Sequence, residues 1–178
     1  MDAFELVRRL ASRLHDELVS QGVDALNPGD LVDAAFRRLD VNLFWLPAGD
    51  PALKGARGVF DDQSGTVCCE MSGTAGERAV LAAHELGHAC VQVGSSSCVA
   101  DDIDPSRSTE AAPVGLQRVE DYGTRERREL QANVFAREFL FPRTLARRLH
   151  LWNTAIHCRK INHGSSSCES LSKAAKQF

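Results

Sequence analysis

The sequence predicts a small α+β domain. Its 178 residues suit one compact domain, with or without a tail, and 43% apolar and 25% charged residues are ordinary values for a globular protein. Segments with the apolar spacing of amphipathic helices and segments rich in strand-forming residues both occur along the chain. No apolar run is long enough for a transmembrane helix, and the acidic N-terminal stretch lacks the pattern of a secretory signal. A cytoplasmic protein without membrane contact is therefore expected.

The first elements are expected to be two helices and a strand. Over residues 2–20, apolar side chains recur at steps of three and four residues, which is typical of an amphipathic helix. A short helix is expected over residues 31–39, with Asp30 as a candidate N-cap. The segment VNLFWL, residues 41–46, is rich in strand-forming residues and ends before Pro47, so it is expected to be a strand.

A β-hairpin and a long helix are expected next. Strand-forming segments flank a turn within residues 58–70, and the second strand is expected at Thr66–Glu70. Thr74 and Glu77 have the spacing of a capping box, in which the two residues satisfy each other's backbone N–H groups. They are expected to open a helix over about residues 75–93.

The rest of the chain contains one further long helix between two weakly patterned segments. Residues 94–121 show no sustained periodicity and are expected to form a long acidic loop. A helix is expected at about 125–140, with Thr124 as a candidate N-cap, and a shorter helix over 143–151. Residues 152–178 are expected to form a weakly patterned C-terminal tail.

The distribution of charge gives little indication of a nucleic-acid partner. The formal net charge is −3, with a net acidic stretch over residues 1–117 and a net basic stretch over residues 118–160. No long polybasic tract occurs, so the basic stretch is interpreted as a solvated helix face and no direct nucleic-acid binding is expected. The six cysteines are expected to be reduced thiols, because no export signal is present.

The segment His84-Glu85-Leu86-Gly87-His88 matches the H-E-x-x-H motif and lies inside the expected third helix. At a four-residue step, His84 and His88 share one helix face, so both imidazoles can reach one metal ion at about the 2.0–2.1 Å of Zn–N bonds. Glu85 lies beside them and can act as a general base without being a ligand. The alternative is a surface trio of polar residues on a helix.

A third ligand is available on the following helix. Glu129 and Asn133 lie one turn apart on one face, together with the small residues Ala132 and Ala136, which permit close packing against the histidine helix. Glu129 can supply the third ligand, and Asn133 can fix a ligand imidazole through a hydrogen bond. Such a site would hold one ion and keep a fourth position open. The alternative is a solvated glutamate in an Arg-rich stretch.

The HELGH segment followed by ELQANVFAREFLFP, residues Glu129–Pro142, resembles the ImmA/IrrE metallopeptidases. The resemblance covers about residues 5–145 and implies a zincin-like metallopeptidase domain over residues 1–151. It implies a gluzincin-like α+β fold with a short mixed or antiparallel sheet packed on the metal-binding helices. It also implies His84, His88 and Glu129 as ligands of one Zn²⁺ ion and Glu85 as the catalytic acid and base.

Members of that family cleave helix-turn-helix transcriptional repressors that control stress or mobile-element genes. The resemblance therefore implies a zinc-dependent endopeptidase acting on a protein partner, with such a repressor as the expected partner by the family's example. Two alternatives are a zinc-bound interaction module that does not cut its partner and an accessory domain of a helicase–nuclease system. The oligomeric state is left open.

Candidate residues also lie outside these two motifs. Tyr122 is the candidate oxyanion donor, with His150 as the other residue of a suitable type. The strand Thr66–Glu70 is expected to lie at a sheet edge, where an extended substrate can pair with it. Cys90 can be a metal ligand or a redox sensor, although a buried thiol with only a packing role is favoured. His15 belongs to no motif and is expected at the surface.

Overall fold

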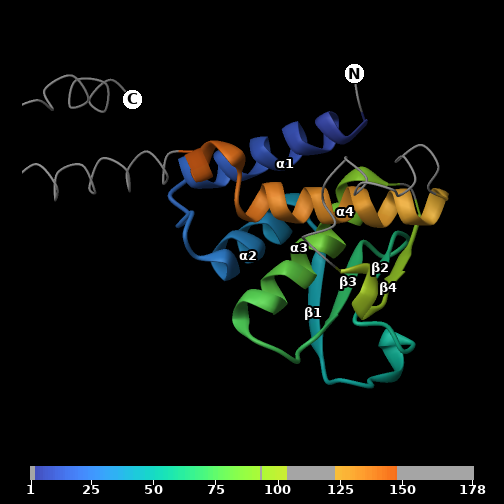
Figure 1. Cartoon of the computed structure of the whole chain (residues 1–178). Helices are drawn as coiled ribbons and strands as arrows, with labels where there is room; N and C mark the ends of the chain where they lie inside the picture. Colours follow the sequence, from blue (N-terminus) through green and yellow to red (C-terminus); the bar gives the residue numbers. More distant parts are fainter. Residues whose placement is uncertain (1–2, 93, 104–122, 148–178) are drawn as a thin grey trace, which may run out of the picture. The chain divides into compact units, whose positions relative to one another are not determined.

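The computed structural model divides the chain into two compact units, Met1–Pro142 and Arg143–Phe178. The fold and the site below belong to the first unit. In the second unit, residues 143–147 are helical, which agrees with the beginning of the expected helix. The expected boundary between domain and tail, after residue 151, lies outside the described residues. The structure describes residues 3–92, 94–103 and 123–147 (Figure 1).

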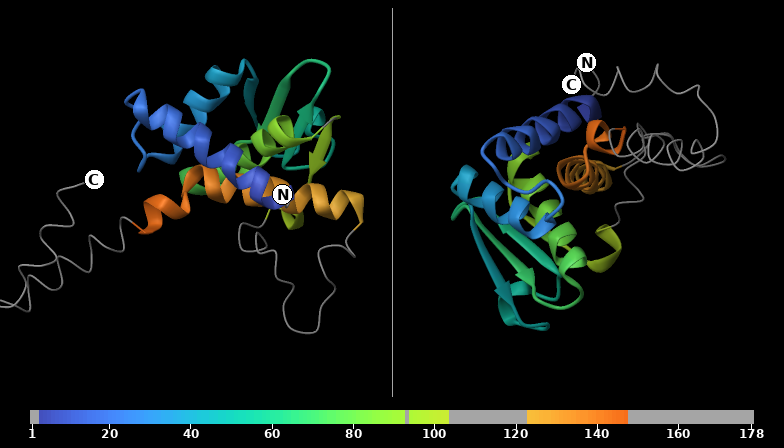
Figure 2. Two further views of the ribbon diagram at one scale, coloured as in Figure 1. Left: turned by 90° about the horizontal axis from the view of Figure 1, so that it is seen from above. Right: turned by 90° about the vertical axis from the view of Figure 1, so that its left-hand side faces the viewer.

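The predicted α+β class is confirmed. Four strands form one mixed sheet in the order β1-β3-β2-β4. Helices α2 and α3 pack on this sheet, α4 packs on α3, and α1 packs on α4 (Figures 1 and 2). The long elements are α1 (Ala3–Ser20), α2 (Pro28–Leu39), β1 (Asn42–Leu46), β2 (Gly58–Asp61), β3 (Thr66–Glu70), α3 (Ala75–Val91), β4 (Ser96–Cys98) and α4 (Thr124–Leu140), with 3₁₀ turns η1 (Pro51–Leu53) and η2 (Ala100–Asp102).

Two helix starts differ from the prediction. Helix α2 is capped by Asn27, whose side-chain oxygen accepts from the backbone N–H groups of Gly29 and Asp30, so Asp30 is not the cap. Pro28 accounts for the difference, since proline suits the first helical position, where its missing N–H costs nothing. Helix α4 has Gly123 as its N-cap in place of Thr124, and the Glu126 carboxylate accepts from the Gly123 N–H. The capping box of α3 is confirmed.

The predicted hairpin is confirmed, but the predicted edge strand is wrong. Strands β2 and β3 pair antiparallel, and β3 also pairs in parallel with β1, from Asn42 opposite Thr66 to Leu46 opposite Glu70. Strand β3 is therefore central and has no free edge for a substrate. Among the described residues, the edge strands are β1 and β4. The parallel partner is distant in sequence, so the local pattern of β3 did not reveal it.

Strand β4 lies in the stretch that was expected to be a loop. Its sequence is Ser96-Ser97-Cys98, which has neither the length nor the apolar content of a typical strand. It forms because β2 offers a partner: Cys98 stands opposite Gly58, and Ser96 stands opposite Phe60. The pairing with β2 places Cys98 next to His88 on α3.

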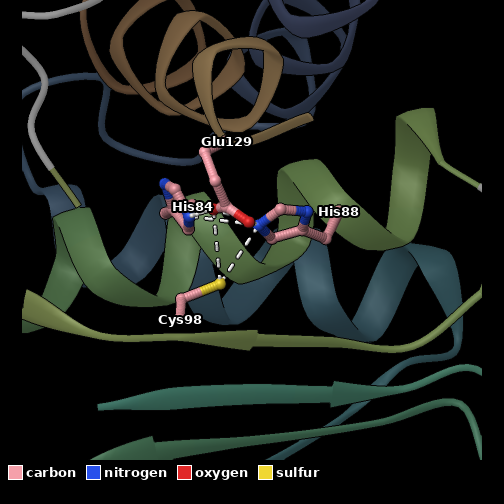
Figure 3. Close-up of side chains that lie close together, drawn as sticks. All are labelled: His84, His88, Cys98 and Glu129. Carbon is pink, nitrogen blue, oxygen red and sulfur yellow. Dashed lines mark hydrogen bonds and ion pairs between the residues drawn. The ribbon is translucent and has the colours of Figure 1, made fainter. Parts of the chain in front are cut away.

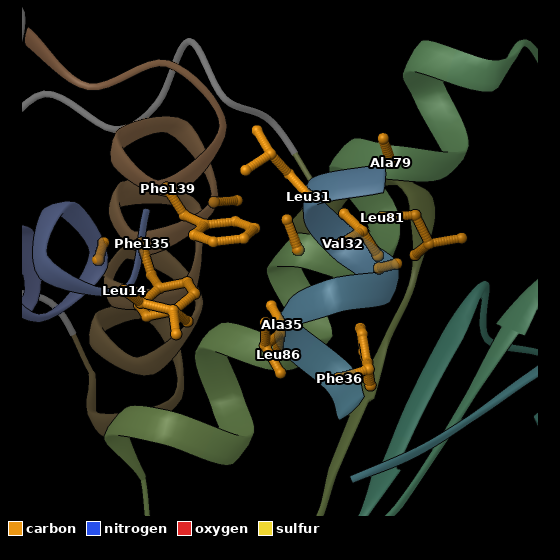
Figure 4. Packing of buried hydrophobic residues seen from close by; sticks show 14 of the residues in the cluster. Leu14, Leu31, Val32, Ala35, Phe36, Ala79, Leu81, Leu86, Phe135 and Phe139 are labelled. Atoms are coloured by element: carbon orange, nitrogen blue, oxygen red, sulfur yellow. The ribbon is translucent and has the colours of Figure 1, made fainter. Parts of the chain in front are cut away.

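The core lies mainly between α3, α4 and the helices that flank them (Figure 4). Gly87 allows α3 to approach α4, because a Cβ at this position would stand 3.0 Å from the Ala132 Cα. Ala132 and Ala136 are almost fully buried at this contact, as their size predicted. Labelled members of the core in Figure 4 include Leu14, Leu31, Val32, Phe36, Leu81, Leu86, Phe135 and Phe139.

The expectation that His15 lies at the surface is wrong. Only 3% of His15 is exposed, and its Nδ1 lies 2.7 Å from the carbonyl oxygen of Phe139. His15 stands four residues after Ala11 and three before Leu18, on the apolar face of α1, so the helical spacing could have identified it. None of the helices within the described residues is both long and apolar enough to cross a membrane.

Candidate metal centre

Four buried or nearly buried side chains converge between α3, β4 and α4 (Figure 3). His84 and His88 come from α3, and Glu129 comes from α4. The structure therefore brings together the three ligands that the sequence predicted. The fourth member is Cys98 on β4, which the sequence did not predict. One ligand atom from each residue lies within 4.8 Å of the other three, so the group could hold a metal ion.

The distances among His84 Nε2, His88 Nε2 and Glu129 Oε2, and from Cys98 Sγ to the last two, fit a small tetrahedral ion, and Cys98 Sγ lies within 4.8 Å of the His84 ligand atom. The two imidazole Nε2 atoms lie 3.1 Å apart, and each lies 3.2 Å from Glu129 Oε2. Cys98 Sγ lies 3.2 Å from His88 Nε2 and 3.6 Å from Glu129 Oε2. Zinc bond lengths at tetrahedral angles would separate nitrogen and oxygen ligands by about 3.3 Å, and sulfur from either by about 3.6 Å.

A hydrogen-bond chain fixes the His84 imidazole. Asn133 Nδ2 donates to the carbonyl oxygen of Asp102 at 2.7 Å, which determines the orientation of the Asn133 amide. Asn133 Oδ1 then faces His84 Nδ1 at 2.9 Å, so the Nδ1–H group of His84 donates a hydrogen bond to it. With the proton on Nδ1, the Nε2 lone pair of His84 is free to face the cluster. This is the contact that the position of Asn133 predicted.

A matching chain fixes the His88 imidazole. Gln92 Nε2 donates to the carbonyl oxygen of Arg128 at 2.7 Å, and Gln92 Oε1 lies 2.7 Å from His88 Nδ1. The Nδ1–H group of His88 therefore donates a hydrogen bond to the Gln92 amide oxygen, and the Nε2 lone pair of His88 also faces the cluster. Gln92 was not predicted to belong to the site. Its position four residues after His88, on the same helix face, was the available signal.

Because both Nδ1 atoms carry the proton, the cluster contains only lone-pair donors: two imidazole Nε2 atoms and the Glu129 carboxylate. Burial raises the pKa of Glu129, but the His84 and His88 imidazoles outweigh this effect and lower the pKa to about 2. Burial lowers the pKa of His88, but the neighbouring Glu129 and Glu85 carboxylates outweigh it and leave the pKa raised. A carboxylate and two imidazole lone pairs at these distances repel one another unless a cation or a proton lies between them.

Cys98 belongs to the same cluster of potential metal ligands. Burial, with the nearby Glu85 and Glu129 carboxylates, raises the pKa of the Cys98 thiol far above its ordinary value. A bound divalent cation reverses this balance, since a coordinating thiol is deprotonated. Cys90 does not join the cluster: it is partly buried against the core, and burial raises its pKa to about 12.

Glu85 lies fully buried beside the cluster. Its Oε2 accepts a hydrogen bond from Ser96 Oγ at 3.2 Å, whereas its Oε1 has no hydrogen-bond partner among the described residues. Gly58 provides the space for this carboxylate, because a Cβ on Gly58 would overlap Glu85 Oε1. A buried carboxylate oxygen without a partner is costly, and sites that handle protons are where such groups persist.

Two predicted site residues, Tyr122 as the candidate oxyanion donor and His150, lie outside the described residues. A scan against protein-family models gave no match, and searches of curated proteins and of solved structures gave none either. The interpretation of the site therefore depends on its geometry and chemistry.

Proposed function

We propose that this chain is a zinc-dependent endopeptidase that hydrolyses a peptide bond in a protein partner. The observation that carries the proposal is the position of Glu85. Its carboxylate is buried next to a cluster of metal ligands, and one of its oxygens has no hydrogen-bond partner among the described residues. A metal centre with a purely structural role does not need such a group.

The donor set supports zinc as the ion. Two neutral imidazoles, a carboxylate and a thiol are the ligand types that zinc uses, and the thiol disfavours magnesium and calcium. His84, His88 and Glu129 would hold the ion. When bound, zinc acts as a Lewis acid toward a carbonyl oxygen and makes a water molecule more acidic.

The residues around the ion have distinct roles in this proposal. Asn133 and Gln92 keep both imidazoles in the tautomer that presents Nε2 to the cluster. Glu85 Oε1 accepts a proton from the water that attacks the peptide carbonyl, and then gives it to the leaving amine nitrogen. The C–N bond breaks, and one water molecule is consumed. Ser96 holds the other oxygen of Glu85 in place.

The resemblance to the ImmA/IrrE family supports a helix-turn-helix transcriptional repressor as the partner. The resemblance is carried by the HELGH and ELQANVFAREFLFP segments. The chemistry of the site does not select this partner over other proteins, so candidate repressors are the first substrates to test rather than a deduction from the site.

The test compares wild type with Glu85→Gln, and it uses Glu126→Gln as the control for a carboxylate at the exposed start of α4. Each full-length protein is loaded with zinc and incubated with purified candidate repressors, and the products are identified by mass spectrometry. We expect equal zinc content in all three proteins and cleavage that only Glu85→Gln abolishes. Cleavage by Glu85→Gln at the wild-type rate, with zinc retained, would overturn the proposed mechanism.

Cys98 favours a second candidate function. Four protein ligands fill a tetrahedral coordination shell, as in structural zinc sites, and such a chain could bind a regulator without cutting it. This alternative predicts zinc-dependent co-purification with an intact repressor, unaffected by Glu85→Gln. It leaves the buried, partly unsatisfied Glu85 without a role, and for this reason we rank it second.

A further inference from the structure

Residues 94–103, named here the β4 strap, pass directly over the metal centre. The strap includes strand β4 and the turn η2, and it supplies Cys98. The peptidase proposal needs three protein ligands and one open position, so it gives Cys98 no role.

Hydrogen bonds join the β4 strap to the sheet, and an ion pair and a hydrogen bond join it to α4. On the sheet side, Arg57 N–H donates to the Cys98 carbonyl oxygen at 2.9 Å, and Asp62 N–H donates to Ser95 Oγ at 3.0 Å. On the α4 side, Asp102 forms an ion pair with Arg125 at 3.0 Å, and its carbonyl oxygen accepts from the Asn133 side chain. These contacts hold the strap across the site.

The β4 strap contacts both the ligands and the proposed base. Ser96 and Cys98 are two residues apart on a strand, so their side chains point to the same face. Ser96 Oγ donates to Glu85 Oε2, and Cys98 Sγ lies 3.2 Å from His88 Nε2. The strap therefore contacts both the proposed base Glu85 and the metal ligand His88, which an incoming water molecule and substrate would need to reach.

The position of the Cys98 sulfur differs from that of an ordinary buried thiol. A thiol with only a packing role is expected among apolar atoms. Cys98 Sγ instead faces the imidazole nitrogen of His88 and the carboxylate oxygen of Glu129. A thiol has one proton and can donate to only one of them at a time, whereas a cation bound between the sulfur, the nitrogen and the oxygen satisfies all three.

We propose that Cys98 is the fourth ligand of the metal ion and that the β4 strap holds the centre closed, so that hydrolysis requires Cys98 to leave the ion. This inference rests on the proposed function for its consequence, but the coordination by Cys98 stands independently of any cleavage.

Cobalt substitution tests the coordination directly. Wild type, Cys98→Ala and the control Cys90→Ala are each loaded with one equivalent of Co²⁺. Wild type and Cys90→Ala should show a near-ultraviolet sulfur-to-cobalt charge-transfer band, and Cys98→Ala should bind cobalt without this band. The absence of the band in wild type, or its persistence in Cys98→Ala, would overturn the inference.

A small metal-binding probe tests whether the centre is closed. Acetohydroxamate needs open positions on the ion, so it should bind cobalt-loaded Cys98→Ala more tightly than wild type by about tenfold or more. Equal affinities for the two proteins would show that Cys98 does not close the site. If Cys98→Ala fails to fold, X-ray absorption of zinc-loaded wild type decides the coordination: one sulfur at about 2.3 Å supports it, and nitrogen and oxygen alone refute it.

These measurements are separate from the test of the peptidase. A sulfur ligand and a closed position, found together with cleavage that does not depend on Glu85, would refute the proposed function and leave the role of Cys98 intact. Cleavage that depends on Glu85 but proceeds at equal rates in wild type and Cys98→Ala would refute the closure. A faster Cys98→Ala would support both.

Discussion

Gly87 on α3 and Ala132 on α4 form a close backbone contact beside the candidate metal centre: a Cβ on Gly87 would stand 3.0 Å from the Ala132 Cα and 3.1 Å from the Ala132 carbonyl oxygen. Both neighbours are backbone atoms, which cannot turn aside as a flexible side chain can. The contact sets the separation between the helix that carries His84 and His88 and the helix that carries Glu129. The glycine inside the motif is therefore a condition for assembling the ligands.

Gly87→Ala should push α3 and α4 apart. We expect a loss of about 1–3 kcal/mol in the free energy of unfolding, as for other overpacked cores, and a weaker zinc affinity. The measurement is urea denaturation combined with chelator competition. Gly76→Ala on the same helix is the matched control, because a Cβ there meets no atom within 4 Å. If Gly87→Ala behaves like Gly76→Ala, the close contact does not set the site.

Gly58→Ala should affect the proposed base and leave the ligands in place. The new methyl group would overlap Glu85 Oε1, so the carboxylate must turn away from its present position. We expect near-wild-type zinc content, a large loss of cleavage and a modest loss of stability. The measurements are zinc analysis and cleavage of the substrate identified with wild type. Full activity in Gly58→Ala would contradict the assigned position of Glu85.

Gln92→Leu should weaken zinc binding although Gln92 is not a ligand. The substitution removes the acceptor of the His88 Nδ1 proton, so the imidazole loses the group that fixes its tautomer and orientation. Loss of such a partner typically costs about 10–100-fold in metal affinity. Competition with a chromophoric chelator measures the change, and Gln63→Leu in the exposed turn after β2 serves as control. An unchanged zinc affinity in Gln92→Leu would show that the hydrogen bond between Gln92 and His88 does not support the metal site.

The stability of the metal-free protein should depend on pH in both directions. The pKa of Glu129 is lowered in the folded state, so its contribution to stability is present above the unfolded value of 4.5 and is lost as the pH falls toward about 2. The pKa of His88 is raised, so its contribution is present below 6.5 and is lost as the pH rises through the folded value. Urea denaturation of chelated protein should therefore give maximal stability between these values.

Bound zinc should remove the loss of folding stability at high pH, because zinc binds the deprotonated ligands. The same denaturation series with zinc in excess is the comparison. Metal-free stability that stays constant from acidic to neutral pH would show that Glu129 and His88 do not interact in solution as they do in the structure.

Much of the fold was predictable because the signals are local. The spacing of α1, the capping box of α3 and the turn of the β2–β3 hairpin are each encoded within a few residues. The H-E-x-x-H motif was predicted on a helix that its capping box marks, and Glu129 was predicted from the face that it shares with Asn133 and two small residues. The histidine spacing then determines which side chains share a face.

The parts that were missed depend on pairing between distant segments. Strand β4 exists because β2 supplies a partner, so nothing in the Ser-Ser-Cys sequence identifies Cys98 as a member of the site. The central position of β3 likewise follows from its parallel pairing with β1. His15 and Gln92 are different, because helical spacing alone puts His15 on the apolar face of α1 and Gln92 one turn after His88.

We propose that His84, His88, Cys98 and Glu129 bind one zinc ion beside Glu85. Anomalous diffraction from crystals of the zinc-loaded full chain, measured at the zinc absorption edge, locates that ion. We expect a single strong peak within bonding distance of both Nε2 atoms, Cys98 Sγ and Glu129 Oε2. No peak between these atoms, or a peak elsewhere with the four side chains apart, would refute the metal centre.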